Sequence, residues 1–345
     1  MDTSTEYFVN ISLDNTTLSP VPSSRAGFPP LLVAFISLQQ TVFVISFIGN
    51  TFVVVIFSMY IKGSITNKFI INLAINDLFT GLSSGSQIFY FLYRDLTKNM
   101  YSCFLRYQVV SVMTFASQFN MTFITADRFI AICGGPTLYQ KLMTKRTSNI
   151  MIALAWVIPL LVCSLPFMGF NKWDLKPRCS FAYIFEEWYY LVPSTTIYTL
   201  MLATLLMYAL ILRKAFTLLR RSLDNTKETN VERREALQQS IRSAKVTATI
   251  TIVFILCWAP YELYQFKYGL GDPRDLANFD LSSWLVFLGI ANSMMNPFIY
   301  AWQKSDFRKN LASILCPYRM EQIIRGSDVK RHVNDESCRR IKTTN

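Results

Sequence analysis

Seven long apolar stretches constrain this chain more than any other feature of its sequence. A helix that crosses the hydrocarbon core of a bilayer needs about 20 mainly apolar residues, and each stretch supplies them. Because a lipid-facing backbone must satisfy its own hydrogen bonds, such stretches predict membrane-spanning helices. The predicted fold class is therefore an all-α membrane protein, a seven-transmembrane helix bundle. The expected spans are Leu31–Tyr60, Lys68–Tyr93, Ser102–Cys133, Asn149–Phe167, Trp188–Leu212, Thr247–Tyr268 and Leu281–Trp302.

The composition agrees with a membrane location and argues against several kinds of catalysis. Of the 345 residues, 52% are hydrophobic and only 16% are charged, whereas an average soluble domain has about 25% charged residues. The single histidine, His332, lies in the polar C-terminal segment. His-based catalytic triads and His-rich zinc sites are therefore not expected within the apolar body, and we do not expect an enzyme.

The positions of the basic residues predict how the chain is oriented. With the N-terminus outside, 25 of the 34 Lys and Arg residues fall on cytoplasmic segments or at cytoplasmic span ends. This is the positive-inside pattern of membrane proteins. Residues 1–30 then form a disordered extracellular N-terminus, in which Asn10 and Asn15 begin Asn-x-Ser/Thr sequons and are candidate glycosylation sites. Residues 31–302 form the seven-transmembrane domain. A transporter or channel is the alternative functional class. No internal repeat is evident in the sequence, which disfavours this alternative.

Several polar side chains occur inside the predicted spans, where each is energetically expensive and therefore a functional hypothesis. The alternative for any one of them is a helix–helix hydrogen bond that only supports packing. Their oxygens are of the kind that a small hard cation binds. The residues concerned are Asn50, Asp77, Ser117, Asn292, Ser293 and Asn296.

A set of short motifs runs through the spans in a fixed order. The set consists of Gly49-Asn50, Leu73-Ala74-x-x-Asp77, Cys103, Asp127-Arg128-Phe129, Trp156, Cys179, Cys257-Trp258-x-Pro260 and Asn296-Pro297-x-x-Tyr300, followed by Phe307. In order and spacing the chain resembles a rhodopsin-like (class A) G-protein-coupled receptor. The resemblance implies a plasma-membrane receptor with a short cytoplasmic amphipathic helix at 303–316 and a disordered cytoplasmic tail at 317–345.

The resemblance also implies roles for individual residues. Cys103 is expected to form a disulfide with Cys179, and Cys316 is a palmitoylation candidate. An allosteric sodium ion is expected at Asp77, Ser117, Asn292, Ser293 and Asn296. The residues implied in switching and G-protein coupling are Asp127, Arg128, Tyr208, Phe254, Trp258, Pro260, Asn296, Pro297 and Tyr300. The implied partners are a heterotrimeric G protein, arrestin and receptor kinases.

The basic segment Arg213–Lys245 lies between the fifth and sixth spans. Basic segments of this kind also occur in nucleic-acid-binding proteins. Its position between two membrane spans favours a helix extension that faces a G protein or anionic lipid. No nucleic-acid partner is therefore expected.

The chain departs from the resembled family at three positions. Leu200 stands where many members have a helix-five proline, and Gln118 replaces a usual aliphatic residue. Ser240 stands where some relatives carry an acid that locks Arg128. Without that lock we expect measurable basal signalling.

The expected ligand pocket is mostly apolar and aromatic, as ligand sites tend to be. Its predicted residues are Arg106, Val110, Ser111, Thr114, Phe181, Trp258, Tyr261, Glu262, Gln265, Val286 and Ile290. Arg106 is suited to an anionic head group or a carbonyl. For Glu262 four roles stay open, namely an ion pair with Arg106, contact with a cationic ligand group, a protonated carboxyl, or a bond to a neighbouring helix.

The ligand class is narrowed by two residues. Amine receptors carry a carboxylate where this chain has Val110, and light-sensing relatives carry a lysine where it has Ile290. Loop and helix-seven features resemble the branch that contains melanocortin, lysophospholipid, cannabinoid and adenosine receptors. A lipid-like or nucleoside-like small molecule is therefore favoured, and a peptide ligand of the same fold is the alternative.

Overall fold

The computed structural model describes residues 30–61, 64–173, 179, 181–224, 231–270 and 279–315. Asn10, Asn15 and Cys316 lie outside these residues, as does the side chain of Ser240. The glycosylation, palmitoylation and missing-lock hypotheses therefore stay predictions, together with the predicted boundaries of the terminal segments.

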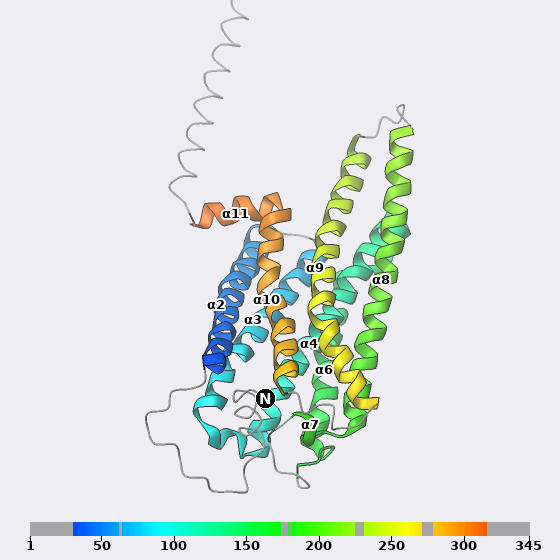
Figure 1. The fold of residues 1–345 in the computed structure, drawn as a ribbon. Coiled ribbons are helices and arrows are strands. Elements are labelled where there is room, and N and C mark those ends of the chain that lie inside the picture. Colours follow the sequence, from blue (N-terminus) through cyan, green and yellow to red (C-terminus); the bar gives the residue numbers. More distant parts are fainter. Residues whose placement is uncertain are drawn as a thin grey trace, which may run out of the picture.

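In the described part of the chain, seven long helices form a bundle (Figure 1). They are α2 (Pro30–Met59), α3 (Ile65–Leu92), α4 (Met100–Phe129), α6 (Lys145–Ser164), α8 (Glu187–Asp224), α9 (Val231–Leu270) and α10 (Phe279–Gln303). Shorter elements connect them, namely η1 (Arg94–Thr97), η2 (Ile130–Gly134), α5 (Gly135–Leu142), η3 (Leu165–Met168) and α7 (Phe181–Ile184). The predicted fold class is confirmed.

Polar caps fix where three of the helices begin. The side chain of Ser64 accepts a hydrogen bond from the Thr66 amide, and that of Asn99 accepts one from the Ser102 amide. Thr144 does the same at the start of α6. Each cap satisfies an amide that has no partner within its own helix, so a polar residue directly before an apolar run begins the helix there.

Six of the long helices are apolar enough to cross a membrane, and α3 is the exception. The helix α3 carries Asn72, Asn76 and Asp77, which lower its hydropathy but are all buried. It packs against α2, α4, α6 and α10, so these side chains face protein and not lipid. The sequence predicts a central third span, and α4 has the largest buried share of the six apolar helices.

The helices α8 and α9 continue well beyond their predicted spans. The fifth span was expected to end at Leu212, whereas α8 continues to Asp224, and α9 begins at Val231 rather than near Thr247. Figure 1 shows both helices projecting past the others at the end of the bundle where α11 (Ser305–Leu315) lies. We call this the α11 end, and we call the opposite end, where α7 lies, the α7 end. The basic segment is thus largely helical, as its position between two spans predicted.

The helix α11 is the expected short amphipathic helix after the seventh span. It runs across the ends of α2 and α10 in Figure 1. Phe307 is fully buried and its ring packs against Phe57 of α2 and Tyr300 of α10. These contacts hold α11 against the bundle.

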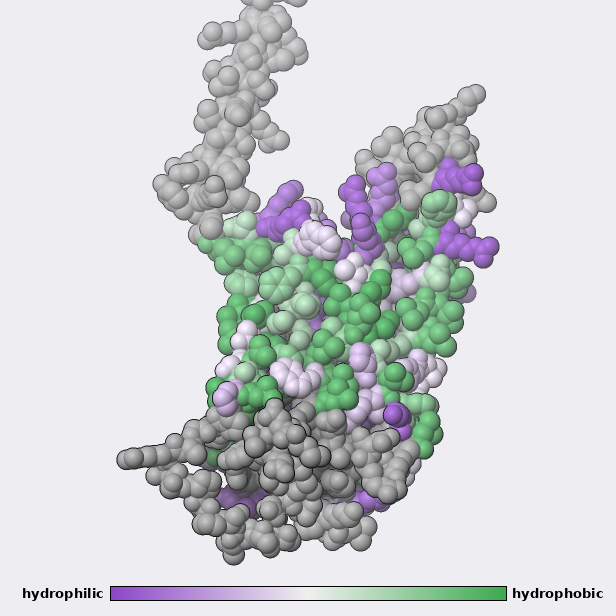
Figure 2. Space-filling view, viewed as in Figure 1, coloured by the Kyte–Doolittle hydropathy of each residue, from purple (hydrophilic) through white to green (hydrophobic). Residues whose placement is uncertain are grey.

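The surface shows how the bundle relates to a bilayer. Figure 2 shows a broad apolar belt across the middle of the face in view, with hydrophilic residues gathered at the α11 end of that face. Exposed Leu, Ile and Phe side chains on the outer faces of the spanning helices form this belt. An exposed apolar surface of this extent is what a membrane-embedded protein presents.

Candidate functional site

A cluster of buried polar residues joins α2, α3 and α10 at the centre of the bundle. Asn296 donates a hydrogen bond of 2.6 Å to the Oδ2 atom of Asp77. Asn50 donates to the carbonyl of Ser293 at 2.9 Å, and Ser46 donates to the carbonyl of Asp77 at 3.0 Å. These bonds connect residues that are far apart in sequence, so they fix how the three helices sit against one another.

The same cluster contains oxygens that have no hydrogen-bond partner among the described residues. They are Asp77 Oδ1, Asn50 Oδ1, Asn292 Oδ1 and Asn296 Oδ1. Unpaired buried oxygens are costly, and a carboxylate with amide oxygens is a donor set that a hard cation accepts. Ser117 is differently placed, since its hydroxyl accepts a hydrogen bond from Asn76. The residues present therefore fit a sodium ion, with Ser117 held by its neighbour.

Close backbone approach between α2 and α10 explains the Gly49-Asn50 motif. A β-carbon at position 49 would stand 2.8 Å from Cγ of Pro297. Only glycine admits this approach, which brings the Asn50 amide within reach of α10. The kink residue Pro297 is therefore packed directly against the first helix.

At the α11 end a buried ion pair holds Arg128. Its guanidinium lies 2.6 Å from Asp127 Oδ2 and also donates a hydrogen bond to the Thr66 hydroxyl. Thr66 in turn donates to Asp127 at 2.7 Å, and Tyr139 of α5 donates to the other carboxylate oxygen at 2.9 Å. Four groups from three helices therefore form one closed network.

The helix α9 is tied to the bundle by other residues. Gln303 at the end of α10 donates a 2.9 Å hydrogen bond to Thr249, and the Thr251 hydroxyl lies 3.5 Å from that of Tyr208 on α8. Within the described part of the chain, Arg128 makes no hydrogen bond or ion pair with α9. At the α11 end, the described hydrogen bonds that link α9 to α8 and α10 are thus made by hydroxyls and an amide.

Three aromatic side chains of α9 form a column of rings within the bundle. Trp258 contacts Tyr261 at a ring distance of 6.0 Å on one side and Phe254 at 6.4 Å on the other. Trp258 and Ile290 are buried in the main apolar core, and Val110, Tyr261 and Val286 pack against that core. Five of the predicted pocket residues therefore belong to one apolar cluster.

Glu262 is buried in the same region, with 4% of its surface exposed. Ser194 of α8 donates a hydrogen bond of 3.2 Å to its Oε2 atom. Of the roles left open for Glu262, the structure shows the bond to a neighbouring helix. Among the described residues it has no ion pair with Arg106 or any other cation.

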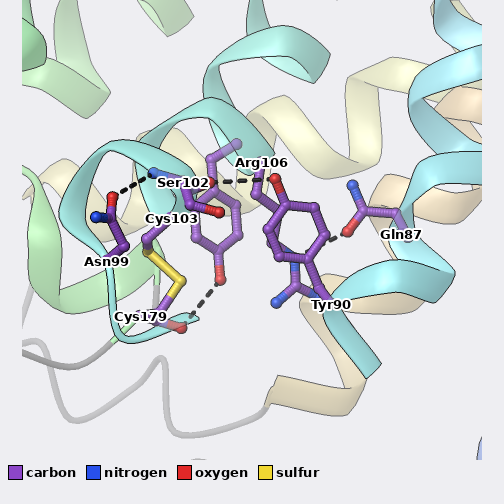
Figure 3. The surroundings of a disulfide bond; sticks show 8 residues. Gln87, Tyr90, Asn99, Ser102, Cys103, Arg106 and Cys179 are labelled. Atoms are coloured by element: carbon purple, nitrogen blue, oxygen red, sulfur yellow. Dashed lines mark hydrogen bonds between the residues drawn. A yellow bond between two sulfur atoms is a disulfide. The ribbon is translucent and has the colours of Figure 1, made fainter. Parts of the chain in front are cut away.

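Arg106 lies apart from Glu262, between α3 and α4. Its Nε atom donates a 2.8 Å hydrogen bond to Gln87, and its guanidinium carbon lies 5.1 Å from the ring centre of Tyr90. Figure 3 shows Arg106, Gln87 and Tyr90 side by side near the disulfide. The Arg106–Glu262 ion pair, one of the roles left open for Glu262, is therefore not formed, because Arg106 is bonded to Gln87 of α3.

At the α7 end of the bundle, α4 is joined to the residues before α7 by a disulfide between Cys103 and Cys179. This pairing is the one predicted. Beside it, the Phe181 ring packs 5.3 Å from that of Tyr107, and the Tyr107 hydroxyl donates to the Cys179 carbonyl at 3.3 Å. Phe181 is thereby held against the α7 end of α4.

Residues 49–300 match the family described as 7 transmembrane receptor (rhodopsin family). The match covers most of the chain and reaches all seven long helices, beginning within α2 at Gly49 and ending within α10 at Tyr300. The chain belongs to this family. It is thus a rhodopsin-like (class A) G-protein-coupled receptor, and the expectation from the motifs is confirmed.

Known receptors of two ligand classes are similar to this receptor. Human adenosine receptor A2b is 29% identical over 77% of this chain and 83% of its own length. Human 5-hydroxytryptamine receptor 4 is 26% identical over 85% of this chain and 82% of its own length. Human adenosine receptor A2a is 27% identical over 84% of this chain and 73% of its own length.

The remaining predicted pocket residues of the receptor are held by its own helices. Ser111 and Thr114 donate to carbonyls one turn earlier on α4, and Gln265 donates to the Tyr261 hydroxyl. Gln118, one of the three positions where the chain departs from the family, is buried. It donates a hydrogen bond to Thr122 at 3.3 Å, while its Oε1 atom has no partner among the described residues. A polar group thus lies where the family usually packs an aliphatic side chain.

Sequence reasoning missed several residues whose hydrogen bonds join helices at the α11 end of this receptor. Thr66, Tyr139 and the pair Thr249 and Gln303 carry no motif that marks them. The only available signal was that Thr66, Thr249 and Gln303 each lie within two residues of the end of a predicted span. Pro193 was missed as well. It lies inside α8, so this helix contains a proline even though Leu200 stands at the position where many family members have one.

Proposed function

We propose that this receptor binds a small molecule near its α7 end and activates a heterotrimeric G protein at its α11 end. The observation that carries the proposal is the position of Trp258. Its ring touches Tyr261 towards the α7 end and Phe254 towards the α11 end, in a helix that contains Pro260. A ligand that favours one placement of this ring shifts the receptor between two states.

The proposed orientation puts the N-terminus outside and the α11 end in the cytoplasm of the cell, at the plasma membrane. The excess of Lys and Arg on the segments at the α11 end supports it. A disulfide near the α7 end also suits the oxidising exterior. The basic extensions of α8 and α9 then face the G protein, and arrestin and receptor kinases share that face.

The ligand is proposed to be nucleoside-like or lipid-like. Phe181 offers an aromatic ring near the outer end of α4, and Gln265 has an amide oxygen with no partner among the described residues. A flat heteroaromatic ring with hydrogen-bonding edges matches these groups. The similarity to adenosine receptors supports the hypothesis of a nucleoside-like ligand.

A ligand with a cationic group is the second candidate, and Glu262 favours it. This buried carboxylate has a single hydrogen bond, from Ser194, and no cation beside it in the described part of the chain. A ligand ammonium would compensate its charge. Glu262→Gln separates the two candidates, because it abolishes the response to a cationic ligand and leaves potency unchanged for a ligand that does not touch it.

Sodium is proposed as an allosteric ligand of the cluster around Asp77. The unpaired oxygens of Asp77, Asn292 and Asn296 support this assignment, with Ser293 beside them and Ser117 one bond further away. The receptor is proposed to act without catalysing a reaction. Glycosylation at Asn10 and Asn15 and palmitoylation at Cys316 complete the proposal.

A ligand screen on the expressed receptor tests the proposal. Nucleosides and lipids come first and biogenic amines second, with second-messenger levels as the readout. Arg128→Ala is the non-coupling control. A compound that acts on the wild type but not on Arg128→Ala, at equal surface expression, supports the proposal. Responses that survive Arg128→Ala contradict the role given to the α11 end.

A further inference from the structure

A cavity of about 400 Å³ lies between α3 and α4, beneath η1. It is separate from the core around Trp258, and Arg106 is the one residue that it shares with the predicted ligand pocket. Its lining follows one face of each helix at helical spacing. The lining residues are Ser83, Ser86, Phe89, Tyr90, Leu96, Ser102, Leu105, Arg106 and Val109.

One part of this lining is polar and carries a single positive charge. The hydroxyls of Ser83 and Ser86 donate hydrogen bonds to backbone carbonyls of α3. In contrast, the Ser102 hydroxyl and the two terminal nitrogens of Arg106 donate no hydrogen bond to any described residue. Arg106 is held in place by Gln87 and Tyr90, so its remaining donors form a preorganised group for an anion.

The other part of the lining is apolar and opens towards lipid. Phe89 and Leu105 are 52% and 54% exposed on the outer face of the bundle. Side chains of this kind on a spanning helix contact acyl chains. The cavity therefore joins a cationic group inside the bundle wall to the hydrocarbon outside it.

We propose that this cavity binds the carboxylate of a long-chain fatty acid taken up from the outer leaflet. Arg106 receives the carboxylate through its terminal nitrogens, Ser102 adds a hydroxyl donor, and the acyl chain leaves between Phe89 and Leu105. A guanidinium matches a carboxylate in a bidentate pair. The lining has one cation, which balances a single negative charge and not a doubly charged phosphate monoester. Only the assignment to the outer leaflet rests on the proposed orientation.

The experiment uses the full-length receptor in phosphatidylcholine nanodiscs and a diazirine-bearing oleate as photoaffinity probe. We expect saturable labelling that maps to residues 83–90 or 102–109. Oleate should compete with the probe, whereas oleyl alcohol, which has the same chain without the charge, should not. Arg106→Gln should weaken the apparent affinity at least tenfold, and Lys98→Gln, which removes an exposed charge at the same end, should leave it unchanged.

A second variant keeps Arg106 and fills the space. Val109→Trp should reduce labelling as strongly as Arg106→Gln, whereas Leu205→Trp on the lipid face of α8 should not. Labelling that does not saturate, equal competition by oleyl alcohol, or full labelling of Val109→Trp would overturn the proposal. If Arg106→Gln fails to fold, the Val109→Trp result decides. G-protein nucleotide exchange, measured on the same samples, reports separately on the proposed signalling function.

Discussion

The indole of Trp258 lies directly against the backbone of Gly289, where a β-carbon would stand 2.5 Å from the ring carbon Cε3. The two residues belong to α9 and α10, the helices that contain Pro260 and Pro297. Since glycine alone admits the ring at this distance, position 289 determines where the central aromatic residue of the proposed switch can rest.

Gly289→Ala should therefore displace the indole and impair switching. Overpacking of this kind costs about 1–3 kcal/mol, so we expect a lower melting temperature and at least a tenfold loss of ligand-stimulated nucleotide exchange. Thermal unfolding and exchange assays on the purified receptor measure both. Leu288→Ala, at the neighbouring lipid-exposed position, is the control. Wild-type exchange in Gly289→Ala would show that the ring position does not govern switching.

Thr249→Ala should raise basal signalling. It removes the hydrogen bond from Gln303 that ties α9 to α10. A bond of this kind contributes about 1 kcal/mol, which corresponds to a change of roughly fivefold in the balance between two states. The matched control is Thr247→Ala, because that hydroxyl donates to the Ala244 carbonyl of its own helix. Equal basal activity in both variants would show that the Gln303–Thr249 hydrogen bond does not stabilise the inactive state.

Sodium should lower agonist affinity in the wild type and not in Asp77→Asn. The substitution keeps the shape of the side chain but removes the charge that balances the cation. Competition binding in sodium chloride and in choline chloride at equal ionic strength measures the effect. Ser84→Ala is the control, since this buried α3 residue donates to Gln39 outside the cluster. A persistent sodium effect in Asp77→Asn would place the ion elsewhere.

Lys304, between α10 and α11, should make stability depend on pH. Burial, with a smaller contribution from the charge of Arg128, lowers the pKa of Lys304 to about 8, while Asp306 opposes the shift. Between about pH 8 and the ordinary value of 10.5 the folded receptor has lost this proton and the unfolded chain retains it. The free energy of unfolding therefore rises with pH across this window, by about 3 kcal/mol at most.

Melting temperatures of the wild type and of Lys304→Met between pH 7 and pH 10 test this dependence. The difference between the two proteins isolates Lys304 from other groups that titrate in the same range. We expect the wild type to gain stability relative to the variant as the pH rises. Parallel curves would show that Lys304 titrates normally.

The sequence was sufficient for the spans and for the family, because apolar length and motif spacing are local properties. It was not sufficient for the ends of α8 and α9, since both helices continue where apolarity stops. The separation of Arg106 from Glu262 depends on how α4 and α9 are rotated in the bundle, and periodicity does not record this. The Gln303–Thr249 bond likewise joins residues whose proximity only tertiary packing creates.

Nucleotide exchange by purified G proteins, with the receptor reconstituted in vesicles, measures whether this receptor activates a G protein. We expect exchange above receptor-free vesicles for at least one G-protein class without added ligand. We also expect Arg128→Ala to abolish this exchange and Thr249→Ala to increase it. Exchange equal to that of empty vesicles for every G-protein class, or full exchange by Arg128→Ala, would contradict this expectation.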